Sequence, residues 1–281
     1  IGRRLLQTIP VFFGATFLIF AMVYLMPVDP VAALGGDRGL DPTVQARIRA
    51  EYNLDKPFWM QYLLYLKGVV TFDFGKTFSG RPVVEQMAHA FPITIRLAFM
   101  AIAIEAIFGI LLGVIAGMRK GKWFDSTILV FSMVLISVPT FVIGFLLQYF
   151  VGVKWGLLPT TVGANVSFKS LLMPAIVLSA VSLAYIIRLT RQSISETAGA
   201  DFVRTARAKG LTSGSVMNRH ILRNSLIPVV TFIGADLGAL MGGAIVTEGI
   251  FGINGVGGML WQGIIRGEPS SVVSVTTALV L

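Results

Sequence analysis

The sequence contains no cysteine and only two histidines, His89 and His220, far apart in the chain. Disulfide bonds, thiol catalysis and cysteine-based metal sites are therefore excluded. The Gly-Lys-Thr triplet at Gly75–Thr77 resembles the end of a phosphate-binding loop. That loop requires a glycine five residues earlier, where this chain has Val70. No Gly-x-Ser-x-Gly motif occurs either. The sequence indicates no metal site and no catalytic chemistry of its own.

Charged residues are also scarce, at 13% of the 281 residues, against about 25% in typical soluble domains. Hydrophobic residues make up 55% and gather in long runs. Because about 20 apolar residues span the hydrocarbon core of a membrane, these runs predict an all-α polytopic membrane protein. A sixth span starts near Ser271 and is expected to be truncated at Leu281. The five complete runs are Leu5–Val28, Leu97–Met118, Ser126–Val153, Ser170–Ile187 and Asn224–Thr247.

Arg3 and Arg4, placed before the first apolar run, also fit a secretory signal peptide. Such a peptide has an apolar core of about 7–15 residues followed by a small-residue cleavage site. The run Leu5–Val28 is longer, and YLMPVDP at its end contains no Ala-x-Ala. We therefore predict a retained first membrane helix.

The basic residues predict the orientation in the membrane. With a cytoplasmic amino terminus, the inner segments 1–4, 118–125 and 188–223 hold twelve Lys and Arg residues, and the short outer loops hold three. This asymmetry follows the positive-inside rule, from which long outer segments such as 29–92 are exempt. The net charge of +9 is thus explained by membrane topology, and nucleic-acid binding is not indicated.

The sequence DFVRTARAKG, residues 201–210, lies in the most basic inner segment. Gly210 suits a helix end because glycine adopts left-handed backbone conformations readily, and Thr212, Ser213 or Ser215 suits the cap of a following helix. The pattern predicts two short helices joined at a glycine. A solvated basic loop is the alternative interpretation. On a helix, the apolar stripe would consist of Gly199, Phe202, Val203, Ala206 and Gly210.

DFVRTARAKGL, followed by RHILRNSLIPVV, resembles the cytoplasmic coupling loop of ABC-importer permeases, in the version found in dipeptide and oligopeptide permeases. The general family motif has Glu-Ala-Ala, three residues and Gly. Here Arg204 replaces Glu, which is usual in the peptide branch. Four other segments in the same order are similar to that family: RRLLQTIPVFFGATFLIFAMVYLMPVDP, YNLDKPFWMQYLLYLKGVVTFDFGKTFSGRPV, AFPITIRLAF and TEGIFGINGVGGML.

The resemblance implies the first of two permease subunits of a peptide-type ABC importer, in a cell or inner membrane. It implies a type I permease fold of six transmembrane helices in one domain, 1–281, with an extracytoplasmic insert at 29–92 and a coupling loop at 188–223. The implied partners are a homologous permease, two ATPase subunits that bind ATP and Mg²⁺, an extracytoplasmic substrate-binding protein and membrane lipid. No cofactor is expected in this chain. The implied coupling residues are Asp201, Arg204, Ala206, Arg207, Ala208, Lys209 and Gly210.

Alternating access between inward- and outward-facing states is the implied mechanism. The cargo stays open among dipeptides, longer peptides, glutathione, haem and nickel-chelates. A secondary transporter, a channel or a membrane-embedded enzyme is also compatible with several spans, but the broken repeats, polar pore rings or clustered catalytic groups that they require are not evident.

In the insert, PTVQARIRAEY predicts a helix capped near Asp41–Thr43, and PFWMQYLLYLKGVV predicts another.

Small and acidic residues inside the spans are the remaining candidate site residues. Glu105, Asp236 and Glu248 are candidates for the translocation path, because acids are costly in lipid and should face protein or water. The alternative for Glu105 and Asp236 is a structural pair with Arg96, Arg188 or a partner subunit, and for Glu248 a gate or docking role. Two glycine ridges predict close helix packing: Gly109, Gly113, Gly117 and Gly234, Gly238, Gly242.

Overall fold

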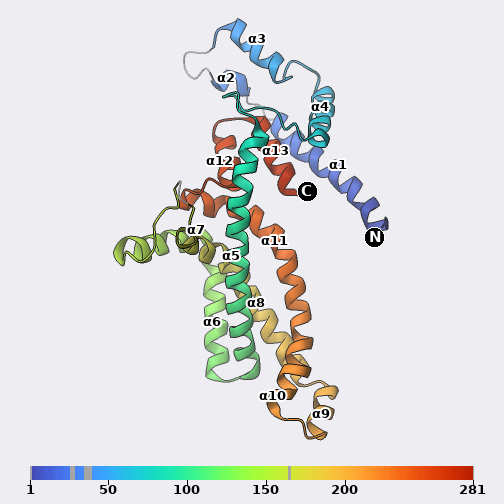
Figure 1. Ribbon diagram of the computed structural model, residues 1–281, viewed down its shortest axis with the longest axis vertical. Helices are drawn as coiled ribbons and strands as arrows, with labels where there is room; N and C mark the ends of the chain where they lie inside the picture. Colours follow the sequence, from blue (N-terminus) through green and yellow to red (C-terminus); the bar gives the residue numbers. More distant parts are fainter. Residues whose placement is uncertain (1, 26–28, 35–39, 164–165, 281) are drawn as a thin grey trace. The chain divides into compact units, whose positions relative to one another are not determined.

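The computed structural model describes residues 2–25, 29–34, 40–163 and 166–280, and this part of the chain is almost entirely helical (Figure 1). The only β structure among these residues is an isolated bridge between Lys76 and Pro82. The all-α class is thus confirmed. The chain divides into two compact units: unit 1 is residues 1–92 with 254–281, and unit 2 is residues 93–253.

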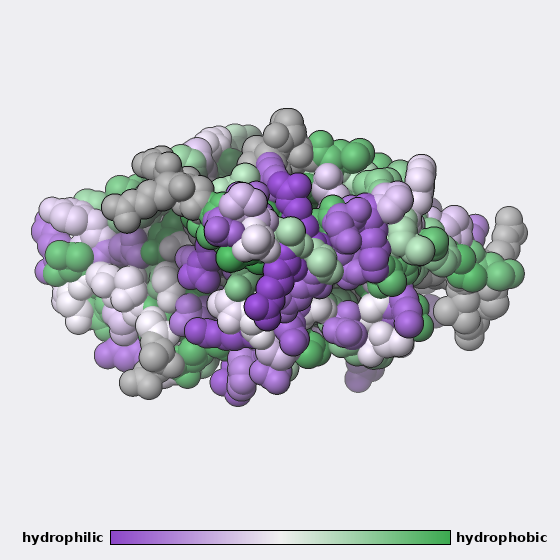
Figure 2. All heavy atoms as spheres, turned by 90° about the horizontal axis from the view of Figure 1, so that it is seen from above, coloured by the Kyte–Doolittle hydropathy of each residue, from purple (hydrophilic) through white to green (hydrophobic). Residues whose placement is uncertain are grey.

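Unit 1 holds the insert and both ends of the chain. The two helices predicted in the insert are present. Asp41 caps α3 by accepting a hydrogen bond from the backbone N–H of Thr43 at 2.8 Å. Seen from above in Figure 2, hydrophilic and hydrophobic residues are intermixed on the insert. The helices of unit 1 are α1 (Gly2–Tyr24), α2 (Pro30–Leu34), α3 (Pro42–Glu51), α4 (Phe58–Thr71), the start of α5 (Val83–Met118), α12 (Val256–Ile265) and α13 (Pro269–Val280).

Aromatic residues form the core of unit 1. Phe20 of α1, Tyr62 of α4 and Val273 of α13 are buried together. The hydroxyl groups of Thr16 and Tyr62 are hydrogen-bonded at 3.1 Å, so a polar contact also fixes α1 to α4. These contacts join the amino-terminal segment to residues from the far end of the chain.

Unit 2 is a helical bundle. Its main core gathers buried residues of α5, α8 and α11, among them Leu97, Val177 and Leu240. Ser167 begins α8 with a reciprocal capping box, in which the backbone N–H of Ser170 donates to the Ser167 hydroxyl at 3.1 Å. The helices of unit 2 are the rest of α5, α6 (Trp123–Ser137), α7 (Thr140–Leu147), the π-helix η2 (Gln148–Lys154), α8 (Phe168–Ala198), α9 (Asp201–Ala208), α10 (Ser213–Val216), the π-helix η3 (Met217–Leu222) and α11 (Arg223–Phe251).

Within the described residues, three helical stretches meet both the length and the hydropathy expected of a membrane span: Val83–Met118, Phe168–Ala198 and Ser213–Phe251. They contain three of the predicted runs. The run predicted as one span over 126–153 is instead bent by 101° between Ser137 and Thr140. Pro139 explains the bend, because the residue before a proline avoids helical geometry, and Val138 is extended with φ −89° and ψ 124°. The predicted run therefore forms α6, α7 and η2 with a sharp bend after α6, and α6 and the following helix are long and apolar enough for a span only together.

The first predicted run forms most of α1, which covers 23 residues, Gly2–Tyr24; residues 26–28 at the end of that run lie outside the described residues. The sixth run forms α13, which contains 12 residues. The 23 residues of α1 are therefore long enough for a full crossing, for which about 20 residues are needed, whereas the 12 residues of α13 are not.

Candidate functional site

The segment DFVRTARAKG forms a short helix whose end is fixed by a glycine. The helix α9 covers Asp201–Ala208, and Gly210 follows it with φ +80°. Thr212 then caps α10, with its hydroxyl accepting from the backbone N–H of Ser215 at 3.4 Å. The predicted helix–glycine–helix pattern is therefore confirmed. The second helix is not separate, however, because α10 continues through η3 into α11.

One face of α9 is anchored inside unit 2. Val203 is fully buried and Ala206 is 4% exposed, and both pack with Ile194, Val216 and Ile221. The predicted stripe is right for Val203 and Ala206. Ala206 therefore points into this cluster and does not offer the small exposed surface for a partner that the coupling assignment implied. Phe202, at 46% exposure, does not share the buried stripe.

The opposite face of α9 is exposed and mixed in chemistry. Phe202 and Leu211 contribute apolar surface beside basic side chains. The ion pair between Arg204 and Asp201 is loose, at 3.7 Å, and both side chains are largely exposed. This face can offer apolar area and positive charge together to another protein. Its exposed predicted residues are Asp201, Arg204, Arg207, Ala208, Lys209 and Gly210.

The helix leading into α9 is tied to the turn between α5 and α6. Arg191 of α8 donates to Asp125 through Nε at 2.5 Å and Nη2 at 2.7 Å. Asp125 also accepts from the backbone N–H of Gly121 at 2.8 Å. Figure 1 shows α9 and α10 at the same end of unit 2 as this turn. Sequence reasoning missed this pair, for which the only signal was an acid three residues after the basic segment Arg119–Lys122.

The first glycine ridge lies directly against α8. A Cβ atom at Gly109 would lie 2.6 Å from Ile186 Cγ2, and one at Gly113 would lie 2.5 Å from Thr190 Cβ. At Gly117 it would lie 2.8 Å from Ile194 Cβ. Real Cβ atoms do not approach so closely, so glycine is required for α5 and α8 to pack at this distance.

The second glycine ridge has a different environment. A Cβ atom at Gly234, Gly238 or Gly242 would meet no atom within 4 Å in the described part of the chain. This stretch of α11 therefore presents a small-residue surface that unit 2 does not cover. Two ridges with the same spacing thus differ in whether this chain supplies the neighbouring helix.

Glu105 and Asp236 form an acidic pair inside unit 2. Glu105 is fully buried, and Asp236 is its electrostatic neighbour. Glu105 Oε1, Glu105 Oε2 and Asp236 Oδ2 are buried without a hydrogen-bond partner. Arg96 and Arg188 form no ion pair with either acid in the described ranges. The pair is therefore left without a cation from these residues.

Asp236 also lines a cavity of about 220 Å³ between α7, α8 and α11. Thr140, Ser182 and Thr247 provide the other polar groups, and the remaining lining is apolar or glycine. An acid in such surroundings has few groups to replace its hydration, so an external cation beside it would be stabilising.

Glu248 lies in a different position from the other two acids. It is fully buried and accepts a hydrogen bond from the Thr94 hydroxyl at 2.5 Å, between α11 and α5. Glu248 therefore has no exposed surface in unit 2, and its role as a gate or docking residue stays a prediction. No group of three His, Cys, Asp or Glu side chains suited to a metal ion occurs in the residues that the structure describes.

Two family models match the chain. The model described as "Binding-protein-dependent transport system inner membrane component" matches residues 109–281, and "Binding-prot-dependent transport system membrane comp, N-term" matches residues 1–98. Together they leave only the middle of α5 unmatched. The bundle with its exposed α9 lies in the first match, and the insert lies in the second.

Curated relatives match over nearly their whole length. The chain is 37% identical to the dipeptide transport system permease protein DppB of Escherichia coli K12, across 99% of this chain and 92% of that protein. It is 35% identical to the di/tripeptide transport system permease protein DppB of Pseudomonas aeruginosa UCBPP-PA14, across 100% and 93%. The dipeptide permease DppB of Alkalihalophilus pseudofirmus OF4 is 32% identical, across 99% and 93%.

Proposed function

The chain belongs to the binding-protein-dependent transport permeases, the non-catalytic inner membrane components of ABC importers, and we propose that its cargo is a short peptide. The cargo is inferred from relatives that are named dipeptide or di/tripeptide permeases. The chain would form the translocation path together with a homologous permease and would alternate between inward- and outward-facing states.

The observation that carries the coupling role is the two-faced α9. Val203 and Ala206 anchor the helix in unit 2, whereas Phe202, Arg204 and Arg207 remain exposed. A rigid helix with free apolar and basic surface suits docking into a cleft on a partner ATPase, where charge-assisted contacts can form. ATP and Mg²⁺ would act on that partner, and its closure would move α9 and with it the bundle.

The orientation supports the same role. The turn between α5 and α6 and the α9–α10 segment lie at one end of unit 2, and both are rich in Lys and Arg (Figure 1). The positive-inside rule places this end in the cytoplasm together with the amino terminus. The insert 29–92 would then lie outside, where a substrate-binding protein delivers cargo.

The uncovered ridge on α11 is suited to the second permease. Small residues at every fourth position allow close approach of another helix in lipid, where apolar burial alone provides no driving force. A Cβ atom at Gly234, Gly238 or Gly242 would meet no described atom within 4 Å, so a helix of the partner permease is the proposed neighbour.

Asp236 is proposed to meet the amino terminus of the peptide, with Glu105 behind it. The support is the cavity beside Asp236 and the absence of a described cation near both acids. A cavity of about 220 Å³ suits one residue of a peptide rather than a whole chain. An ion pair with the partner permease is the competing structural role.

Transport by the purified importer tests the function. Proteoliposomes containing the complex purified through this chain, with its binding protein added, should accumulate labelled dipeptide only with ATP. Glutathione, haem and a nickel-chelate serve as competitors, since similar permeases carry them. Uptake of one of these compounds and not of dipeptide would show that this compound, and not a peptide, is the cargo. Accumulation without ATP would indicate a secondary transporter or channel.

A further inference from the structure

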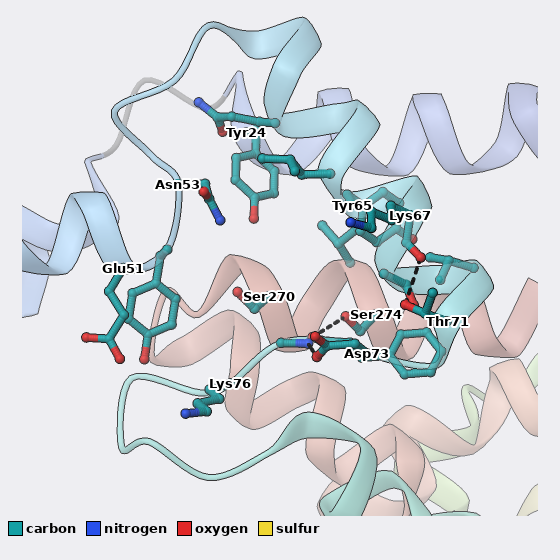
Figure 3. Close-up of a pocket in the computed structure, with 18 residues that line it drawn as sticks. Tyr24, Glu51, Asn53, Tyr65, Lys67, Thr71, Asp73, Lys76, Ser270 and Ser274 are labelled. Carbon is teal, nitrogen blue, oxygen red and sulfur yellow. Dashed lines mark hydrogen bonds between the residues drawn. The ribbon is translucent and has the colours of Figure 1, made fainter.

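A second cavity, of about 460 Å³, lies entirely within unit 1 and is not used by the mechanism above (Figure 3). Its walls come from the end of α1, the end of α3, α4 with the loop after it, and α13. The volume falls within the range of about 300–1000 Å³ that is typical of small-molecule sites. Residues from both matched regions line the cavity: α1, α3 and α4 lie within residues 1–98, and α13 lies within residues 109–281.

Hydrogen bonds between separate segments hold the walls together. The Ser274 hydroxyl of α13 donates to the carbonyl oxygen of Phe74 at 3.2 Å. The hydroxyl groups of Tyr65 and Thr277 are also hydrogen-bonded, which joins α4 to α13. On the α3 side, the Tyr52 hydroxyl donates to the carbonyl oxygen of Thr77 at 2.6 Å. The cavity is therefore preformed, which lowers the entropic cost of binding a ligand.

Two acids and two bases line the cavity, so its charge is balanced. Glu51, Asp73, Lys67 and Lys76 form no ion pair with any residue in the described ranges. Figure 3 shows Glu51 and Lys67 at opposite ends, with Asp73, Ser270 and Ser274 between them. A ligand with a single charge would pair with an acid or a base of the cavity, but not with both. A ligand with one positive and one negative group would find an opposite charge at each end, Glu51 at one and Lys67 at the other.

A polar atom inside the wall also lacks a partner. Gln61 donates through Nε2 to the carbonyl oxygen of Lys56 at 2.7 Å, but its buried Oε1 accepts no hydrogen bond. A buried acceptor without a donor is unfavourable by about 1–3 kcal/mol. A ligand N–H group in the cavity would satisfy it.

We propose that this cavity binds a small zwitterion, with its ammonium group toward Glu51 and its carboxylate toward Lys67. Tyrosine and serine hydroxyl groups along the walls are suited to hydrogen-bond a peptide group between the two charged ends. The identification of this zwitterion as a short peptide rests on the proposed function. The site would hold cargo on the outer side, apart from the cavity at Asp236.

Protection of a single cysteine measures this binding directly, because the chain has no cysteine of its own. The Ser270→Cys variant places a thiol in the cavity wall, and Ser79→Cys places one on the exposed part of the same unit. The complete importer is used without ATP and without its binding protein. Dialanine should slow modification by a hydrophilic thiol reagent at position 270 and leave position 79 unchanged.

Blocked peptides and a charge variant test the ligand orientation. N-acetyl-dialanine and dialanine amide each lack one charge and should protect about fivefold less well, the effect of one exposed ion pair. In the Ser270→Cys/Glu51→Gln variant, dialanine and N-acetyl-dialanine should protect the thiol equally well. Glu85→Gln, an exposed acid outside the cavity, is the matched control and should preserve the difference.

Equal protection by all three compounds in the Ser270→Cys variant, or none by any, overturns the site. If Ser270→Cys does not assemble, Thr71→Cys replaces it, because the Thr71 hydroxyl bonds only to carbonyls of its own helix. Peptide uptake measured on the same preparations separates the two proposals. Peptide uptake without protection of the cysteine would refute the proposed site and leave the proposed function standing. Protection without peptide uptake would support the site and refute a peptide as the cargo.

Discussion

Arg191 binds Asp125 through two parallel hydrogen bonds, from Nε to Oδ1 and from Nη2 to Oδ2. The Asp125 side chain is 4% exposed and the Arg191 side chain 23%. Bidentate pairing of a guanidinium and a carboxylate is strong and fixes orientation. Because Arg191 lies on α8 shortly before α9, the pair makes the helix before the proposed coupling site rigid.

Removing one member of this pair should destabilise the importer. Asp125→Asn or Arg191→Gln leaves a charged or polar group without its partner. The free energy of unfolding should therefore decrease by about 3 kcal/mol. The double variant Asp125→Asn/Arg191→Gln should lose less than the sum of the two single losses. Thermal unfolding of the purified complex measures the losses. Asp201→Asn changes an exposed pair and is the control, so the melting temperature should change little. If the losses of the two single variants add up in the double variant, Asp125 and Arg191 act independently.

The two glycine ridges should respond differently to an added methyl group. Gly113→Ala would place Cβ 2.5 Å from Thr190 Cβ and 2.8 Å from the Ile187 carbonyl oxygen, a clash of about 1–3 kcal/mol. The added methyl group of Gly238→Ala meets no atom within 4 Å among the described residues, so the variant should fold normally while associating more weakly with the second permease. Melting temperature and co-purification of the second permease report these effects. Normal stability of Gly113→Ala would contradict the close packing of α5 on α8.

Gly210→Val should uncouple transport from ATP hydrolysis. Valine at φ +80° is strained by about 1–2 kcal/mol and would disturb the end of α9 without entering the membrane. We expect normal membrane levels, weak ATPase association and little uptake. Gly214→Ala, at a glycine inside α10 with open space around it, is the control. Arg204→Ala should be milder, since an exposed pair contributes only about 0–1 kcal/mol. Full uptake by Gly210→Val would reduce the segment to a solvated loop.

Single-cysteine labelling should establish the orientation. Ser79 and Ser213 are both exposed, and the chain has no other thiol. On intact cells, an impermeant reagent that has access to the outer face should modify Ser79→Cys and spare Ser213→Cys. After the cells are opened, both should react. The reverse pattern on intact cells would move α9 to the wrong side for an ATPase.

Asp236→Asn should reduce peptide uptake more than stability. The change removes the charge beside the cavity of about 220 Å³ and keeps the size of the side chain. Peptide affinity and uptake should decrease, and a peptide with an acetylated amino terminus should be affected less. Lower complex yield with unchanged coupling would instead favour a structural pair with the partner permease.

Composition and local pattern were sufficient for the class and for several helix ends. Long uncharged runs predicted membrane helices because unpaired charges are excluded from hydrocarbon. Gly210 was predicted as a helix end, and the caps Asp41 and Thr212 lie among the candidates Asp41–Thr43 and Thr212, Ser213 or Ser215, since capping and left-handed conformations depend on a few neighbouring residues. The family resemblance, spread over five segments, predicted the permease role that the relatives confirm.

Only the tertiary structure decided which face of each element is used. Spacing alone did not distinguish the ridge Gly109–Gly117, packed on α8, from the ridge Gly234–Gly242, where added Cβ atoms at Gly234, Gly238 and Gly242 would contact nothing in the part of the chain that the structure describes. The pairing of Arg191 with Asp125 and the burial of Glu248 likewise depend on residues distant in sequence. Membrane helices are apolar on all sides, so the sequence carries no amphipathic signal for the side that meets protein. That choice is made by packing and hydrogen bonds between helices, which form only when the bundle assembles.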